Sequence, residues 1–191
     1  ATSLEFIASL QCFPILDCLS HVVKDMCRGE LDEGFLSDQS SIESALTILK
    51  AKTTRLIQAC GECPFYLLGE PILKEMVTFC ESFGTLFQLT DDYIDYFGTS
   101  EQLNKAVGQD LSQHIFNIPI LLLTQKLSDS EKSLFTHQFQ SGAISFQHIN
   151  ELLKSHSVHT DLMAMIDHHQ NLCRQSLESQ PNTIYKDFLF S

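Results

Sequence analysis

The sequence predicts an all-α protein, a bundle of antiparallel helices joined by short loops. Apolar residues recur at the three- and four-residue spacing of helices, whereas the strict alternation of a strand is hard to find. Only 8 glycines and 5 prolines interrupt the 191 residues, so long elements are expected. Apolar residues make up 43% of the chain, which excludes a disordered protein and supports one domain over residues 1–191.

The first two helices follow from apolar spacing and end signals. The first is expected over Leu4–Cys27, ending near Gly29, and Pro14 can introduce a kink in it. The segment Ser40-Ser41-Ile42-Glu43 reads as a capping box, with serine at the N-cap and glutamate three residues later. It opens a second helix that runs to about Cys63.

The remaining helices begin with a third long one over about Pro71–Phe97. Shorter helices are expected at about 112–126, 129–140, 145–155 and 158–178. Pro119 fits the first of these only near a helix start or at a kink, because proline removes a backbone donor.

The charge balance restricts the partners. Against 24 acidic residues stand 12 Lys and Arg, a net charge of −12, which argues against nucleic acid and against an anionic membrane surface. No apolar run approaches the roughly 18 residues of a membrane span, so no integral membrane segment is expected. Carboxylates can still bind a divalent metal.

Seven scattered cysteines indicate a reducing compartment rather than a disulfide framework. We expect a cytoplasmic location and leave a mitochondrial one open. Cys60 and Cys63 form a C-x-x-C pair without a second ligand pair, and both are expected in the core of the second helix. The chain begins Ala1-Thr2-Ser3 without a methionine, so we expect that this is not the natural N-terminus.

The C-terminal end of the third helix carries the strongest functional signal. The helix is apolar nearly all round, which indicates a buried position. Asp91, Asp92 and Asp95 then repel one another and oppose the helix dipole. Buried carboxylates need a partner, and Mg²⁺ would be a suitable one. Alternatively, the three aspartates simply project into solvent beyond the core.

The segment Gly84–Tyr96 resembles the second aspartate-rich motif of trans-isoprenyl diphosphate synthases, G-x-x-F-Q-x-x-D-D-x-x-D, and matches every specified position. Gln102–Leu111 resembles the family's Q-L-G-K-x-x-G-x-D-L segment, and Gly29-Glu30 and Lys52-Thr53 match its G-E/Q and K-T elements. The matches extend over about residues 4–125 and are most similar to long-chain members such as octaprenyl diphosphate synthases. The chain is identified as a C-terminal portion of such a protein.

The resemblance implies the helical bundle of the isoprenoid synthase type, and a homodimer. It also implies a prenyltransferase that condenses isopentenyl diphosphate with an allylic diphosphate, using Mg²⁺, to give a longer trans-polyprenyl diphosphate. The implied residues are catalytic Lys52, Thr53 and Gln88; substrate-binding Lys52, Phe87, Gln88 and Lys105; and the metal ligands Asp91, Asp92 and Asp95.

Several of these residues have ordinary alternatives. Lys52 lies at the edge of a buried stripe, where lysine usually extends its ammonium to solvent. Phe87 can equally be a core residue, and Lys105 can be an ordinary loop lysine.

Two departures from the family pattern bear on activity. The family's first D-D-x-x-D motif is missing and is expected upstream of residue 1, so the 191-residue chain alone is expected to be inactive. In the segment that resembles D-L-x-x-G-K-x-T-x-P, His114, Ile115 and Asn117 replace glycine, lysine and threonine. A non-catalytic helical partner subunit of a heteromeric prenyl synthase therefore stays an alternative, and a helical interaction module is a weaker third. Product length and natural primer are left open.

Overall fold

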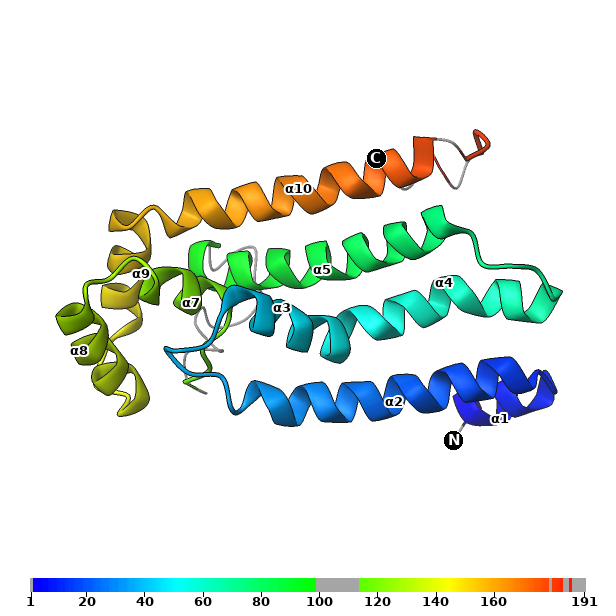
Figure 1. Ribbon diagram of the computed structural model, residues 1–191, viewed down its shortest axis with the longest axis horizontal. Coiled ribbons are helices and arrows are strands. Elements are labelled where there is room, and N and C mark those ends of the chain that lie inside the picture. Colours follow the sequence, from blue (N-terminus) through cyan, green and yellow to red (C-terminus); the bar gives the residue numbers. More distant parts are fainter. Residues whose placement is uncertain (1, 99–113, 179, 184–185, 187–191) are drawn as a thin grey trace. The chain divides into compact units, whose positions relative to one another are not determined.

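The computed structural model describes residues 2–98, 114–178, 180–183 and 186 (Figure 1). Every regular element in these ranges is helical, so the all-α prediction is confirmed. The elements are α1 (Thr2–Ser9), α2 (Phe13–Glu33), α3 (Ile42–Leu49), the π-helical turn η1 (Lys50–Thr54), α4 (Arg55–Leu68), α5 (Lys74–Phe97), α7 (Ile118–Thr124), α8 (Asp129–Gln140), α9 (Phe146–Ser155) and α10 (Val158–Glu178).

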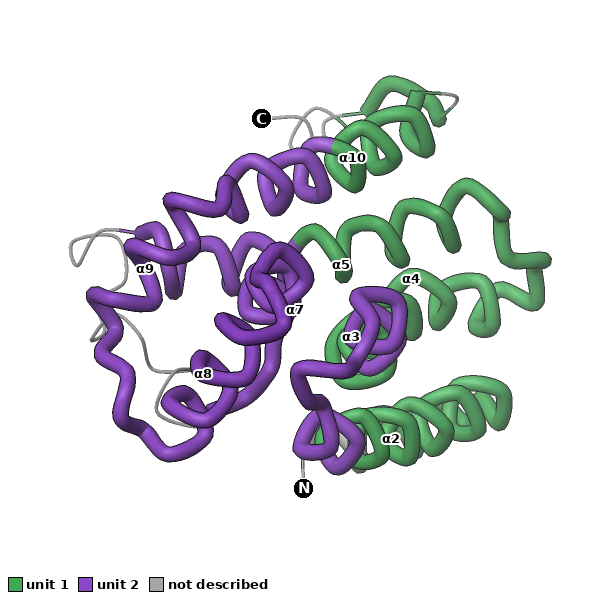
Figure 2. The backbone as a smooth tube through the Cα atoms, turned by 60° about the vertical axis from the view of Figure 1, so that its left-hand side comes forward, with its two compact units in different colours: residues 1–30, 49–86, 168–191 green, residues 31–48, 87–167 purple. Residues whose placement is uncertain are grey.

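The chain divides into two compact units, shown in Figure 2. Unit 1 comprises residues 1–30, 49–86 and 168–191, and unit 2 comprises residues 31–48 and 87–167. The expectation of one domain stays a prediction. No helix in the described ranges is both long enough and apolar enough to cross a membrane.

Unit 1 is a row of antiparallel helical segments from α2, α4, α5 and α10 (Figures 1 and 2). Cys18 and Val22 of α2 pack against Ala59 of α4 in its core. On α10, the Cys173 thiol lies 3.9 Å from the carbonyl oxygen of Phe79 on α5. Contacts between successive neighbours therefore bury the inner faces of this unit.

Unit 2 has an aromatic core. Phe139 of α8 is fully buried, with its ring centroid 5.0 Å from that of Phe116 and 5.5 Å from that of Phe135. Ile149 of α9 is also fully buried, and α7 packs on α9. These contacts tie α7, α8 and α9 together near the end of α5.

The first expected helix is two helices. The chain breaks at Gln11, whose φ of 50° lies in the left-handed region. Pro14 is the second residue of α2 and not a kink, because the first turn of a helix tolerates a residue without an N–H. α2 then runs past Gly29 to Glu33.

The second expected helix also differs at its start. Its N-cap is Ser41, whose hydroxyl accepts from the Ser44 backbone N–H at 3.0 Å. Ser40 instead accepts from the Ser37 backbone N–H, so the expected capping box with Glu43 was wrong by one residue.

In the middle of that helix, the π-turn η1 shifts the buried face. A π-turn has more residues per turn than an α-helix, so residues beyond it change face. Thr54 is therefore 1% exposed, while Cys60, which was expected in the core, is exposed. The prediction that Cys60 packs in the core was wrong; Cys63 is half-buried.

The later helices agree better with the sequence. α8, α9 and α10 begin and end within one residue of expectation. α7 begins only at Ile118, with Pro119 in its first turn, as the missing proline N–H requires.

Candidate functional site

The acidic end of α5 lies in unit 2, and its aspartates differ in exposure. Asp92 is only 4% exposed, and its Oδ1 accepts a hydrogen bond from the Gln88 side-chain amide at 3.0 Å. Asp91 is exposed and Asp95 half-buried. Asp91 and Asp95 are one helical turn apart and so share a face. Of the two expectations, buried carboxylates and solvated ones, each holds for part of the motif.

Side chains from α7, α9 and α10 anchor this end of α5. The buried Tyr96 donates its hydroxyl hydrogen to Asn117 Oδ1 at 3.3 Å. The Asn150 amide donates to the Tyr96 backbone oxygen at 2.7 Å, which satisfies a carbonyl of the last turn. The Tyr93 hydroxyl and His159 Nε2 are 3.0 Å apart. These contacts fix the helix end that carries the aspartates.

Asn150 carried no signal in the sequence, and His159, one of several histidines in this part of the chain, was expected to face solvent without a metal-binding role. The contact of each with α5 gives it a role in the structure. Asn117 was noticed only as a departure from the family pattern. In the structure it is the N-cap residue of α7 and accepts from Tyr96 instead of capping with its side chain.

The chemistry of the acidic end suits Mg²⁺ in part. No group of three His, Cys, Asp or Glu side chains in the described ranges is arranged to hold a metal ion. Asp91 and Asp95 nevertheless supply hard oxygen atoms from adjacent turns of one face. Mg²⁺ typically takes one or two carboxylates and completes its shell with water and phosphate oxygens. The aspartates therefore fit a partial coordination sphere, not a complete cage.

Phe87 and Gln88 lie one turn before the aspartates. Phe87 is 57% exposed, so plain core packing does not describe it within unit 2. Gln88 is half-buried, and its bond to Asp92 fixes the direction of its amide. An exposed aromatic face beside an oriented amide can stabilise developing positive charge.

The Lys52-Thr53 pair lies in unit 1, in the π-turn η1. The Lys52 ammonium is 3.0 Å from Glu30 Oε2 on α2, and the Lys52 side chain is 34% exposed. Thr53 is half-buried. The expected simple extension of Lys52 into solvent is thus replaced by an ion pair.

The π-turn fits closely against α5 at Gly84. A Cβ at this position would lie 2.8 Å from the Thr54 Cα, closer than real contacts allow. The glycine of the G-x-x-F-Q pattern therefore permits two backbones to approach. Its presence explains how residues before the aspartates position the turn that carries Lys52.

The remaining expected residues divide into two groups. Lys105 lies outside the described residues, so its role stays a prediction. His114 is described and has a φ of 54°, with its ring centroid 5.9 Å from that of Phe139.

Comparisons with known proteins agree with this architecture. Residues 1–156 match the family model described as polyprenyl synthetase. A heptaprenyl diphosphate synthase component 2 from Geobacillus stearothermophilus is 35% identical over 126 residues, covering 63% of this chain and 39% of that protein. An octaprenyl diphosphate synthase from Haemophilus influenzae is 24% identical over 198 residues, covering 98% of this chain and 59% of that protein. The chain therefore spans well under two thirds of the length of these relatives.

Solved structures share the fold. A decaprenyl diphosphate synthase from Rhodobacter capsulatus superposes with a TM-score of 0.86 at 18% identity, covering 98% of this chain and 60% of that one. An octaprenyl pyrophosphate synthase from Helicobacter pylori superposes with a TM-score of 0.79 at 23% identity, covering 92% of this chain and 58% of that one. At these identities the likeness establishes the all-α fold alone.

Proposed function

This chain belongs to the polyprenyl synthetase family, and from that premise we propose that the protein is a trans-polyprenyl diphosphate synthase. It would join isopentenyl diphosphate to an allylic diphosphate. The bond between the allylic carbon and diphosphate breaks, the isopentenyl alkene forms the new carbon–carbon bond, and the adduct loses a proton to the released diphosphate. The observation that carries the proposal is the acidic end of α5, where Gln88 and Asp92 are bonded beside the exposed Asp91.

The residues of α5 have distinct roles in this proposal. Asp91 and Asp95 hold Mg²⁺, and Asp92 also contributes while it orients Gln88. Bound Mg²⁺ supplies Lewis-acid chemistry by neutralising the charge of a departing diphosphate. The Gln88 amide dipole, whose direction the hydrogen bond to Asp92 fixes, stabilises positive charge on the allylic carbon. A neutral, delocalised amide is too weak a nucleophile to trap the cation. The exposed face of Phe87 favours cationic character nearby.

Lys52 serves as a diphosphate ligand. Its ammonium is a compact charge that neutralises phosphate oxygens through charge-assisted hydrogen bonds. Thr53 adds a hydroxyl donor, and Lys105 a second cation. The π-turn supports these roles for Lys52 and Thr53, since such turns are frequent at functional sites.

We propose that the protein is located in the cytoplasm and that it assembles as a homodimer. The support lies on α2, where Phe13, Leu16 and Val23 are 78%, 38% and 61% exposed. Their spacing places them along one side of the helix. An exposed apolar stripe of this kind is typical of a surface that another protein segment covers, and we propose a second copy of the protein as its partner.

A non-catalytic partner subunit is the second candidate. His114 and Asn117, which replace family residues, make packing and hydrogen-bond contacts within unit 2. The Geobacillus relative is named as a component, which fits a two-component synthase. Under this alternative the chain would hold the fold and support a separate catalytic subunit.

Product formation separates these candidates. The full-length protein is incubated with Mg²⁺, farnesyl diphosphate and labelled isopentenyl diphosphate, and lipid products are analysed by chain length. The proposal predicts a product longer than the primer. No elongation by this protein alone would favour the partner subunit. Residues 1–191 by themselves are expected to be inactive, because they contain one D-D-x-x-D and the family pattern has two.

A further inference from the structure

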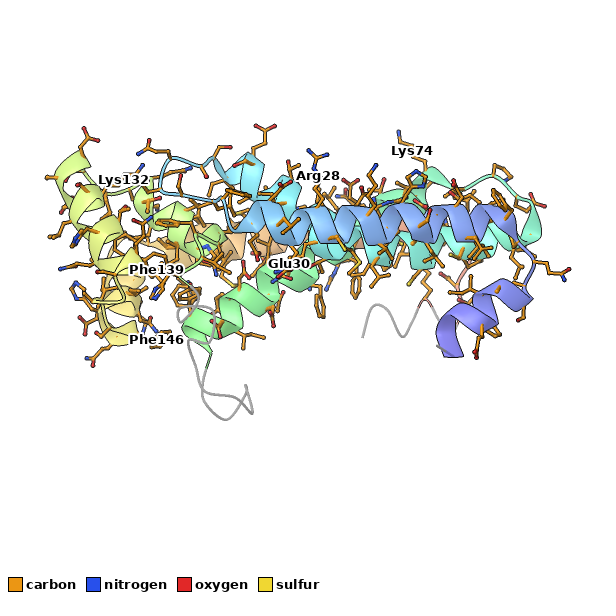
Figure 3. All side chains as sticks on the ribbon, turned by 90° about the horizontal axis from the view of Figure 1, so that it is seen from below. Arg28, Glu30, Lys74, Lys132, Phe139 and Phe146 are labelled. Carbon is orange, nitrogen blue, oxygen red and sulfur yellow. The ribbon has the colours of Figure 1, made fainter. Side chains whose placement is uncertain are left out.

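The Lys52 ammonium already has an anionic partner within unit 1. Its Nζ lies 3.0 Å from Glu30 Oε2, an ion pair that joins η1 to α2. Glu30 and Arg28 project from opposite sides of α2 in the view of Figure 3, as a separation of two residues on a helix requires. The Lys52 ammonium, which is proposed to bind diphosphate, is therefore already paired with a carboxylate of the protein.

We propose that Glu30 is a counter-ion of Lys52 that diphosphate must displace when it binds. The ion pair between Glu30 and Lys52 forms again when diphosphate leaves. Glu30 is a positioning residue in this role and touches no reacting atom. The proposal rests on the proposed function, because it needs Lys52 to bind diphosphate. It goes beyond that function by giving the protein a built-in competitor for its own anionic ligand.

The exposure of the pair makes this exchange feasible. The side chain of Glu30 is 64% exposed and that of Lys52 is 34% exposed. Ion pairs of this kind are weak, since water screens them and both side chains lose freedom. A diphosphate carries more charge than one carboxylate and offers several acceptor oxygens. Diphosphate can therefore displace Glu30 from Lys52, and breaking this ion pair lowers the affinity for diphosphate only modestly.

A second ion pair on the same turn provides a comparison. Lys50 Nζ lies 2.8 Å from Glu81 Oε1 on α5, with exposed fractions of 45% and 42%. Both pairs connect η1 to a neighbouring helix, but only Lys52 has an assigned ligand. If Glu30 only stabilised the position of η1, loss of the Glu30 carboxylate or of the Glu81 carboxylate would affect ligand binding to a similar extent. If Glu30 competes with ligand, only its loss would change ligand binding.

The test is calorimetric titration of the full-length protein with inorganic pyrophosphate at fixed Mg²⁺. Glu30→Gln keeps the size of the side chain and removes its charge, and Glu81→Gln is the matched control. Since exposed pairs of this type are weak, we expect Glu30→Gln to lower the Kd for pyrophosphate about 1.5- to 5-fold. Glu81→Gln should bind as wild type does. The gain should shrink at high salt, where the pair is screened.

Lys52→Met separates this proposal from the proposed function. We expect Lys52→Met to weaken pyrophosphate binding, and Glu30→Gln to lose most of its effect in that background. An unchanged or higher Kd for Glu30→Gln, with binding weakened by Lys52→Met, overturns the role of Glu30 alone. Equal binding by wild type and Lys52→Met overturns the role of Lys52, and the role of Glu30 with it.

Discussion

Neighbouring aspartates at the end of α5 have opposite surroundings. Asp92 is buried and hydrogen-bonded to Gln88, whereas Asp91 is exposed. Like charges one turn apart, as in Asp91 and Asp95, destabilise a helix by about 0.2–0.5 kcal/mol. Such an arrangement is kept where the carboxylates serve a function other than folding.

Asp91→Asn tests this separation of stability from function. We expect the free energy of unfolding in urea to stay the same or rise by about 0.2–0.5 kcal/mol, because a repulsion is removed. The Mg²⁺ concentration for half-maximal elongation should rise by about tenfold or more. Asp92→Ala is the contrasting variant. It should lower the free energy of unfolding by about 1–3 kcal/mol, because the Gln88 amide loses its acceptor. A marked loss of stability in Asp91→Asn would contradict this account.

His169 on α10 makes stability depend on pH. Burial lowers the pKa of His169 below its ordinary value of 6.5, and the charges of His168 and Lys50 act in the same direction. The unfolded chain therefore binds a proton at higher pH than the folded chain does. This contribution to stability is complete above pH 6.5 and is lost as the pH falls through the folded-state pKa.

Urea unfolding at pH 7.5 and pH 5.5 measures this contribution. His169→Gln should lose less stability between the two pH values than wild type does. His137→Gln, at an exposed position on α8, is the control and should retain the wild-type difference. Identical pH dependence in His169→Gln and wild type would show that His169 does not carry the effect.

Among the elements, helix existence was predictable and helix phase was not. The spacing of apolar residues located α8, α9 and α10 within one residue. The same spacing could not reveal η1, because a single π-turn has no distinctive residue pattern. The segment therefore reads as a continuous α-helix. Cys60 was consequently placed on the wrong face. The break at Gln11 was missed for a related reason, since a left-handed residue other than glycine has little sequence signature.

Gly84 is the point at which α5 and η1 depend on each other. Gly84→Ala adds a Cβ that would lie 2.8 Å from the Thr54 Cα, so one backbone must move. We expect the free energy of unfolding to fall by about 1–3 kcal/mol, as in other overpacked sites. Gly34→Ala is the control, because its added Cβ would meet only the Leu31 carbonyl oxygen at 3.5 Å. Equal stability of Gly84→Ala and wild type would mean that η1 adapts without cost.

For the whole molecule, the sequence located the motif residues and left their partners unknown. The pattern around Gln88 and Asp92 could be recognised because it specifies several residue types at fixed positions over a long segment. The contacts of Asn150, His159 and Glu30 were not, because each depends on a tertiary neighbour distant in sequence. Side chains that support a site are therefore visible only in the fold, even where the site itself can be read.

The exposed stripe of α2 predicts the oligomeric state. Val23→Asp places a charge in the stripe at a position that is 61% exposed, so folding should be little affected. We expect sedimentation equilibrium to show a dimer for wild type and a monomer for Val23→Asp. His21→Asp, at an exposed position that the 3.6-residue turn of the helix places off this stripe, is the control and should stay dimeric. A monomeric wild-type protein would contradict the proposed assembly.

The most direct test of the central claim is the rate of isopentenyl incorporation by full-length protein before and after the change Asp91→Ala. Labelled isopentenyl diphosphate, farnesyl diphosphate and Mg²⁺ are supplied in excess, and folding of both proteins is verified by thermal unfolding. The account predicts elongation by wild type and a loss of at least tenfold in the folded Asp91→Ala protein. Equal rates for the two proteins, or no elongation by either, would contradict a prenyl-transfer site at the acidic end of α5.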